Sequence, residues 1–152
     1  MTPLSTTAIT KSFVNCSQGE AKSIAQPPGL LEQDWDALDY LGWFDPKAPG
    51  RAVIVAEHDG RLTGIVLRPA SSEGARRGMA LCNLCQQGRE SDEVLLFTAR
   101  KAGKSGRQFG NSVGTYICTA FACSALATDR EGLRHRLGVF LNHVLERDAV
   151  GS

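Results

Sequence analysis

The sequence lacks the features that mark membrane, secreted and repeat proteins. No run of about 18 apolar residues is present, as a helix that spans a bilayer requires, and no internal repeat is found. The first five residues lack the basic and apolar regions of a secretory signal. The formal net charge of +1 gives no support for a general polyanion binder or an acidic tail. Cysteines without a signal favour a reducing compartment, so we expect a cytoplasmic protein without membrane contact.

Local motifs of common enzymes are also missing. No serine or cysteine nucleophile has a histidine and a carboxylate in a recognisable local arrangement, and there is no P-loop. None of the three histidines, His58, His135 and His143, has metal-ligand spacing to the cysteines. Residues distant in the sequence can still assemble a catalytic site. The simpler expectation is a binding protein, not an enzyme, with no small-molecule substrate.

What the sequence does contain is two close cysteine pairs. Cys82 and Cys85 form the first pair, and Cys118 and Cys123 follow after 32 intervening residues. Thiolates are soft ligands, and four of them around zinc give a tetrahedral site that is closed to water. The first pair suits a tight knuckle, and the wider second pair suits a strand end followed by the first turn of a helix. This spacing predicts a structural Zn²⁺ site at these four cysteines.

Two other interpretations of the cysteines remain open. All four could be buried as small apolar residues, or Cys82 and Cys85 could form a redox-active pair. A redox motif is expected near a βαβ pattern, whereas the surroundings here indicate a strand and a hairpin. The fifth cysteine, Cys16, lies 66 residues before the cluster, and we expect a buried small residue there rather than a ligand.

Helical patterns occupy the first third of the chain. Residues 5–7 offer N-cap side chains for a helix over residues 8–16. Residues 30–42 carry apolar side chains at helical spacing, which predicts a second helix, and residues 43–46 then form a loop. The apolar stripe of this second helix consists of Leu31, Trp35, Leu38 and Leu41.

From residue 52 onward the pattern changes to strands. Two β-rich runs, 52–57 and 62–67, flank Asp59-Gly60, which is a strong hairpin signal. A mobile glycine-rich connection is expected over residues 101–111. Further strands are expected over residues 79–82, 93–99 and 113–118.

The C-terminal helix has the clearest pattern in the chain. Thr128 and Glu131 fit a capping box at its start. Six apolar residues form one face of this helix: Leu133, Leu137, Phe140, Leu141, Val144 and Leu145.

The cysteine segment follows the order of a treble-clef zinc finger: knuckle, hairpin, then helix. The expected fold class is α+β, an antiparallel sheet with a four-cysteine treble-clef zinc finger, N-terminal helices and a C-terminal amphipathic helix. The length predicts a single domain over residues 1–150. Its parts are a helical part over 5–45, the sheet and zinc finger over 52–127, and the last helix over 129–147.

Positive charge gathers around the cysteine segment. Between Arg76 and Arg107 lie seven basic residues and three acidic ones, a local excess of +4. Complementary charge speeds and orients the encounter with an acidic partner, and interface cores favour aromatic anchors. This predicts a partner-binding surface that includes Arg100, Lys101, Lys104, Arg107, Phe109 and Tyr116. The alternative is that the basic loop is merely solvated and that Tyr116 belongs to the core of the sheet.

Several of these segments resemble one protein family. The motif Cys82-Asn83-Leu84-Cys85 and residues 94–99, 113–124, 13–17 and 41–43 are similar to the elongation-factor-G-binding proteins, which include proteins behind one form of fusidic acid resistance. The resemblance covers most of the chain and is most specific at the cysteines. It implies a C-terminal treble-clef domain with zinc ligands at those four cysteines. It also implies binding to elongation factor G on the ribosome and promotion of its release.

The resemblance is to the short, single-domain members of the family. The N-terminal helical bundle of the two-domain resistance proteins is absent from the sequence, so drug resistance itself does not follow. An alternative is an RNA- or ribosome-binding zinc module without factor binding. Such a module needs stacking aromatic side chains between its basic residues, and only Phe109 is suitably placed.

Overall fold

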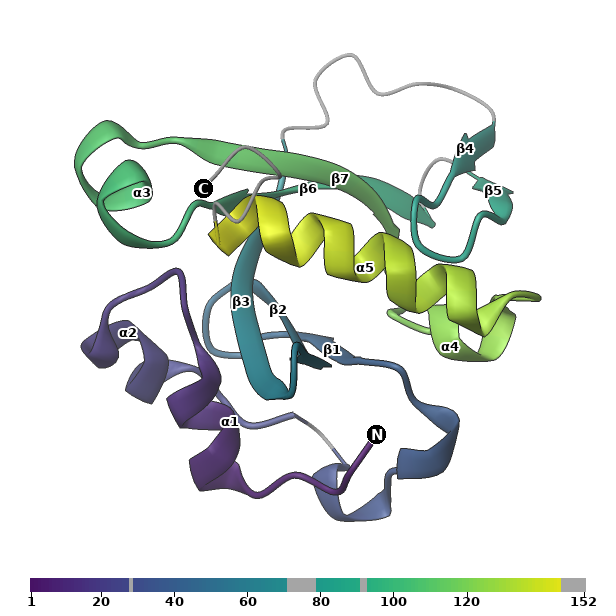
Figure 1. Ribbon diagram of the computed structural model, residues 1–152, viewed down its shortest axis with the longest axis horizontal. Helices are drawn as coiled ribbons and strands as arrows, with labels where there is room; N and C mark the ends of the chain where they lie inside the picture. The colour runs from purple at the N-terminus through teal and green to yellow at the C-terminus, as the bar shows by residue number, and fades with distance from the viewer. Residues whose placement is uncertain (28, 71–78, 91–92, 146–152) are drawn as a thin grey trace.

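The centre of the fold is a five-stranded antiparallel sheet (Figure 1). The computed structural model describes residues 1–27, 29–70, 79–90 and 93–145. In spatial order the strands are β1 (Leu41–Phe44), β2 (Ala52–His58), β3 (Arg61–Pro69), β6 (Val94–Arg100) and β7 (Ser112–Cys118). A separate two-stranded sheet pairs β4 (Met79–Leu81) with β5 (Gly88–Glu90). The sheet and the helices together confirm the predicted α+β class.

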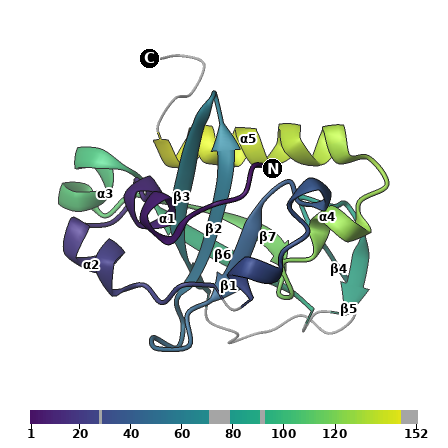
Figure 2. The ribbon, with the colours of Figure 1, turned by 90° about the horizontal axis from the view of Figure 1, so that it is seen from below.

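Helices cover both faces of the sheet. The helical elements are α1 (Thr6–Ser12), α2 (Gln18–Ser23), the 3-10 turns η1 (Leu30–Glu32) and η2 (Trp35–Ala37), α3 (Gly103–Phe109), α4 (Cys123–Leu126) and α5 (Arg130–Leu145). In Figure 2, α5 lies on one side of the β2–β3 hairpin, and α1 lies on the other side. Within the described residues, no helix is long and apolar enough to cross a membrane.

Strand β2 is buried on both faces. Its residues Ala52 to Ala56 are fully buried, and they divide by alternation between two hydrophobic clusters. Ile54 packs in the cluster that contains the apolar face of α5, whereas Val53 and Val55 pack in the cluster that contains Ile9 of α1. A strand covered on both faces reads as a continuous apolar run, which is why residues 52–56 show no polar alternation.

The predicted β2–β3 hairpin is confirmed. Strand β2 pairs with β3 from Ala52 with Leu67 to His58 with Arg61. Asp59 has φ 51° and Gly60 has φ 74°, so both central residues of the turn are left-handed. Two such residues match the right-handed twist of the flanking strands.

Asn15 joins the two halves of the sheet where their pairing is short. Strands β3 and β6 pair only through Arg68 with Thr98 and Pro69 with Phe97. Just before this point, the Asn15 amide accepts from the Val66 N–H at 2.8 Å and donates to the Val66 carbonyl at 3.0 Å. It also donates to the Arg100 carbonyl at 3.0 Å. The side chain therefore takes the place of a neighbouring strand at Val66.

The N-terminal predictions need two corrections. The helix expected over 8–16 is α1, which begins earlier, with Ser5 accepting from the Ala8 N–H, and ends at Ser12. Its end is fixed because the Val14 N–H bonds the Gly64 carbonyl of β3. The sequence did not indicate the short helix α2, which Ser17 caps by accepting from the Glu20 N–H.

The helix expected over residues 30–42 is wrong, as is the loop expected over 43–46. Only the turns η1 and η2 form there, and residues 41–44 are strand β1, which pairs with β2. Leu41 and Trp43 are two apart and both buried, as a strand requires, and the Trp43 indole donates to the Ala25 carbonyl at 3.0 Å. Pairing with a buried neighbouring strand overrides the helical spacing of the leucines.

The mobile connection expected over residues 101–111 is also wrong, because it contains helix α3. The Lys101 N–H bonds the Asn111 carbonyl at 2.8 Å and closes the segment. Gly106 allows the tight turn, since a Cβ there would lie 1.8 Å from the Lys101 carbonyl oxygen. The helix ends at Phe109, and the next residue, Gly110, has φ 67° and donates its N–H to the carbonyls of Gly106 and Ser105.

The start of α5 differs in detail from the predicted capping box. Asp129, not Thr128, accepts from the Gly132 N–H at 2.9 Å. The predicted apolar face is buried at Leu133, Leu137, Phe140, Leu141 and Val144. Residues 146 and 147, which were expected to extend the helix, lie outside the described residues.

A buried ion pair fixes the chain between β1 and β2. The Asp45 carboxylate has no exposed surface and accepts hydrogen bonds from the Arg51 guanidinium and from the backbone N–H groups of Lys47 and Ala25. Burial alone would raise the pKa of the Asp45 carboxyl, but these hydrogen bonds, that of Arg51 first, hold the pKa below its ordinary value.

We expect Asp45→Asn to destabilise the protein by about 3 kcal/mol, because it removes the nearest charge partner of the buried Arg51 and leaves only the longer contact with Glu20, at 3.7 Å. The exposed Asp36→Asn is the control, with a change within about 0.5 kcal/mol. The pKa of Asp45 is lower in the folded protein than in the unfolded chain, where an aspartate has a pKa of about 3.9. Its contribution to the free energy of unfolding is therefore fully present above that unfolded pKa, and it is lost as the pH falls through the pKa of the folded state. Urea unfolding at neutral and acidic pH measures both effects. Equal stability of the two variants at neutral pH would contradict this account.

Candidate metal centre

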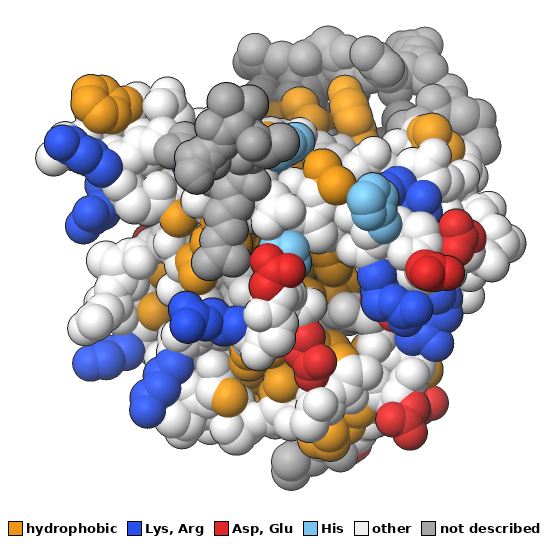
Figure 3. Space-filling view, viewed as in Figure 1, with side chains coloured by type: hydrophobic (Ala, Val, Ile, Leu, Met, Phe, Trp, Pro, Cys, Tyr) orange, Lys and Arg blue, Asp and Glu red, His pale blue; other side chains and the backbone are white. Residues whose placement is uncertain are grey.

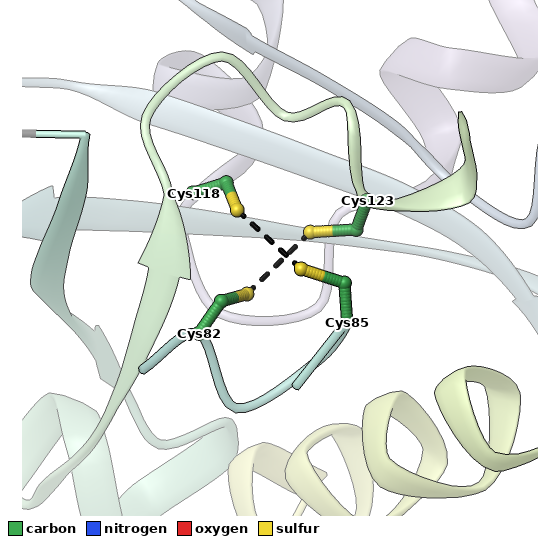
Figure 4. Close-up of side chains that lie close together, drawn as sticks. All are labelled: Cys82, Cys85, Cys118 and Cys123. Atoms are coloured by element: carbon green, nitrogen blue, oxygen red, sulfur yellow. Dashed lines mark hydrogen bonds between the residues drawn. The ribbon is translucent and has the colours of Figure 1, made fainter. Parts of the chain in front are cut away.

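The structure brings Cys82, Cys85, Cys118 and Cys123 to one point. The first two lie in the turn between β4 and β5, Cys118 ends β7, and Cys123 begins α4. All four are buried, with at most 2% of the residue exposed. Their sulfur atoms lie within 4.8 Å of one another and point toward a common centre (Figure 4).

Local hydrogen bonds shape the turn of the first pair. The Gln86 N–H donates to the Cys82 carbonyl at 2.9 Å, and the Cys82 N–H donates to the Gln87 carbonyl at 3.2 Å. Gln86 is left-handed, with φ 60°, and its side chain donates to the Asn83 carbonyl at 2.8 Å. The predicted knuckle is thus a closed turn that directs both sulfurs to the same side.

The turn of the second pair is held by aromatic packing. Phe121 has φ 52°, and its N–H donates to the Cys118 carbonyl at 3.1 Å. Its ring contacts Phe44 and Phe97, with centroids 5.4 and 5.6 Å away. A left-handed residue that is not glycine costs of order 1–3 kcal/mol and needs support from its surroundings. The aromatic contacts provide this support, and they place Cys123 opposite Cys82.

The spacing of the sulfurs fits one metal ion. The Sγ atoms of Cys82 and Cys123 are 3.6 Å apart, and so are those of Cys85 and Cys118. A disulfide would require about 2.05 Å. Four sulfurs at about 2.3 Å from a tetrahedral zinc ion lie about 3.8 Å from one another. The four cysteines are therefore positioned to bind one metal ion, in a site without an open position for substrate.

The electrostatics of the cluster favour a thiolate. Hydrogen bonds from Cys118 and Cys123 lower the pKa of the Cys82 thiol to about 2. The same contacts, from Cys118 first and then Cys82, raise the pKa of Cys123. Cysteines bind a metal as thiolates, so a divalent ion that binds here displaces the thiol protons.

Helix α5 and strand β7 hold the knuckle in place. Arg136 of α5 donates to the Leu84 carbonyl, which lies between the first two cysteines, at 3.0 Å from Nε and 2.7 Å from Nη2. The Asn83 N–H donates to the Tyr116 carbonyl of β7 at 2.8 Å. No local sequence pattern indicates this role of Arg136, because its partner is a backbone carbonyl 52 residues away.

Tyr40 is a second residue of the site that no local sequence pattern indicates. It is 1% exposed and lies in the same buried cluster as the four cysteines. The preceding residue, Asp39, donates its N–H to the hydroxyl of Ser124 at 2.8 Å. Burial, and after it the Cys123 sulfur, raise the pKa of Tyr40 well above its ordinary value.

The fold of this region is a treble-clef zinc finger. It consists of the knuckle, the β6–β7 hairpin and helix α4, with the four buried cysteines at their junction. The sequence profile of the family described as "FBP C-terminal treble-clef zinc-finger" matches residues 8–141. The chain belongs to this family, and the cofactor is structural zinc. No curated protein sequence matches the chain significantly.

Among solved structures, the chain is similar to "Structure of the fusidic acid resistance protein FusC". The TM-score is 0.57 and the identity is 24%, over 78% of this chain. The match spans about half of that protein, 52% of its length. This likeness supports the fold.

The predicted partner-binding residues lie in two places. Arg100, Lys104, Arg107 and Phe109 are exposed on or next to α3, and Lys101 beside them is partly buried. Tyr116 is 36% exposed further along β7, beside the knuckle. Arg76 and Arg77 lie outside the described residues.

Cys16 lies away from the cluster. We expected Cys16 to be buried, but it is only half-buried. Burial first, and then the nearby Glu20, raise the pKa of its thiol to about 11. It packs in the cluster that contains Ile9, on the face of the sheet opposite α5.

We expect freshly purified, reduced protein to contain about one zinc ion per chain, since four thiolates complete one tetrahedral site. Cys82→Ser or Cys123→Ser should lose most of the zinc and unfold the zinc-finger part, because metal-binding free energy is folding free energy. Metal analysis by mass spectrometry and circular dichroism measure these effects. Cys16→Ser is the matched control, and a loss of zinc in it would show that the ligand set is wrong.

Proposed function

We propose that this protein is a zinc-stabilised binding protein of the translation apparatus that binds elongation factor G and promotes its release from the ribosome. Cys82, Cys85, Cys118 and Cys123 hold the zinc in this proposal. The metal has no open position, so it supports the structure and the protein acts by binding rather than by catalysis. A partner on the ribosome places the protein in the cytoplasm. Membership of the family supports this proposal, and the surface formed by α3 supports the manner of binding.

The observation that carries the proposal is the exposed aromatic side chain on α3. Phe109 is 69% exposed, the highest exposure among the large hydrophobic residues of the described chain. It is the last residue of α3, directly before the left-handed Gly110. Figure 3 shows apolar atoms beside Lys and Arg side chains over α3. An aromatic side chain ringed by charge is typical of the centre of a protein interface.

The α3 segment is held firmly enough to act as a preformed surface. Residues 101 and 111 close it by a backbone hydrogen bond, and the Asn111 side chain donates to the Ser105 hydroxyl at 2.8 Å. The Ala102 N–H donates to the Val144 carbonyl of α5 at 2.7 Å. A surface that is ordered before binding loses less entropy on association. The backbone that carries Phe109 is therefore held in place before binding.

The surface continues along the face of β6 and β7 that is turned away from the core. Directly opposite residues of two strands share a face, and the pairs on this face are Arg100 with Ser112, Thr98 with Gly114 and Leu96 with Tyr116. All six are exposed or partly exposed. The face thus runs from Arg100, next to α3, to Tyr116 beside the zinc knuckle.

The segment from β6 to β7 carries basic but no acidic side chains. No acidic residue occurs between Glu93 and Asp129 in the sequence. A hollow of about 230 Å³ beside α3 is lined by Arg68 and Arg100, and Arg68 was not part of the sequence prediction. Glu20 also lines this hollow, and its carboxylate lies 3.7 Å from both Arg68 and Arg51. Two guanidinium groups in one hollow suit a carboxylate of the partner.

We expect purified elongation factor G to bind the protein without RNA, in a biolayer interferometry experiment. Reversing Arg100, Lys104 and Arg107 to Glu should slow association about tenfold at low salt, because these charges steer the encounter. The control reverses three exposed lysines elsewhere, Lys11, Lys22 and Lys47, for the same change in net charge. Zinc content and melting temperature should be unchanged in both variants. Equal loss of binding in the two variants would exclude a specific role for α3.

Phe109→Ala should instead speed dissociation about tenfold or more, since the loss of a central aromatic anchor typically costs about 2 kcal/mol. If the isolated factor does not bind, the proposal is wrong. Tight binding to ribosomal RNA, with an affinity that falls linearly on a log–log plot against salt, would assign the basic residues to RNA phosphates.

A further inference from the structure

Tyr40 carries the one buried side-chain nitrogen or oxygen that lacks a hydrogen-bond partner among the described residues. The other buried polar side chains of the sheet region are well matched, as with the amide of Asn15 and the carboxylate of Asp45. A buried hydroxyl without a partner costs about 1–3 kcal/mol. Phenylalanine would fill the same space without this cost, so the hydroxyl of Tyr40 requires an explanation.

The surroundings of Tyr40 place this hydroxyl beside the metal centre. The Asp39 N–H bonds the Ser124 hydroxyl, so the pair Asp39-Tyr40 lies next to the pair Cys123-Ser124. The Asp39 carboxylate is in turn bound by Arg130, at 2.9 and 3.2 Å, and by Arg134, at 3.1 Å. These contacts fix the segment before β1 against the start of α5. Tyr40 packs in the same buried cluster as Cys123, and after burial the Cys123 sulfur is the first group that raises the pKa of its hydroxyl.

The protonation state of Cys123 decides whether its sulfur is a good acceptor. A neutral thiol accepts hydrogen bonds weakly, whereas a thiolate that binds a metal keeps negative charge and accepts charge-assisted bonds that are roughly twice as strong. Residues that hydrogen-bond to metal ligands orient them and tune the metal. We propose that the Tyr40 hydroxyl donates a hydrogen bond to the Cys123 thiolate of the zinc-loaded protein and is a positioning residue of the metal centre.

This inference uses the proposed ligand set but does not depend on factor binding. For the change in zinc affinity of Tyr40→Phe, it predicts the opposite sign from a purely structural role of Tyr40. If Tyr40 only fills space, Tyr40→Phe removes an unpaired buried hydroxyl and leaves zinc affinity equal or improved. If Tyr40 donates to the thiolate, the same variant loses a ligand contact and binds zinc more weakly.

The chain offers a matched control, because it has only two tyrosines, Tyr40 and the partly exposed Tyr116. We expect Tyr40→Phe to weaken zinc binding by about tenfold or more in competition with a chromophoric chelator, and Tyr116→Phe to leave it unchanged. The cobalt-substituted Tyr40→Phe protein should also show sulfur-to-metal charge-transfer bands at lower energy, because a thiolate without its donor gives more charge to the metal. Unchanged affinity and spectrum in Tyr40→Phe would overturn the proposal.

A second measurement covers the case in which Tyr40→Phe fails to fold. In the Tyr116→Phe variant every tyrosine signal comes from Tyr40, so ultraviolet resonance Raman bands of the zinc-loaded variant report its hydroxyl alone. We expect the pattern of a phenol that donates a hydrogen bond. The pattern of a free phenol would contradict the proposal, and absence of zinc in the wild-type protein would instead contradict the ligand set.

Discussion

The cluster of four cysteine sulfurs is the constraint on which the zinc-finger part depends. The β4–β5 hairpin has strands of three residues each and pairs with no other strand among the described residues. A hairpin of that size is at best marginally stable alone. Its position on β7 rests on the sulfur cluster, on one backbone hydrogen bond from Asn83 to Tyr116, and on the contact between Arg136 and Leu84. The free energy of metal binding therefore contributes directly to folding here.

Helix α5 connects this centre to the rest of the molecule. Its apolar face packs in the same buried cluster as the cysteines and the inner residues of β2 and β3. Its arginines reach two other segments: Arg136 holds the knuckle, and Arg130 and Arg134 hold Asp39 beside Tyr40. At its other end, the Val144 carbonyl accepts from Ala102 just before α3. Helix α5 thus links the metal centre to the proposed partner surface. An ordered metal centre therefore favours an ordered partner surface.

The sequence predicted those parts of the fold that local chemistry determines. The Asp59-Gly60 turn and the β-branched runs beside it specify a hairpin without help from distant residues, and the cysteine spacing identifies the metal centre. The helix expected over residues 30–42 failed because its leucines serve a strand that is stabilised only by pairing with β2. Helix α3 was missed because its glycines read as loop signals, whereas Gly106 is needed for close contact with the Lys101 carbonyl. Asn15 and Arg136 bind backbone groups that are 51 to 85 residues away in the sequence. Tyr40 lies beside the metal centre. No local sequence pattern reveals such contacts.

The closed metal centre and the exposed surface have complementary roles. A tetrahedral four-thiolate site has no position for a substrate, so a function that involves the metal must act through the shape that it imposes. That shape reaches the surface through β7, whose last residue is Cys118 and whose first residues follow α3. Fixing Cys118 fixes the register of β7 against β6, and this register sets which side chains share the outer face with Arg100. A slip of one residue would turn Tyr116 and Ser112 to the core side and bring Ile117 to the surface. In the proposed function, zinc therefore contributes to recognition by holding one strand register, while the proposed contacts with the partner come from α3 and the outer face of the β6–β7 hairpin.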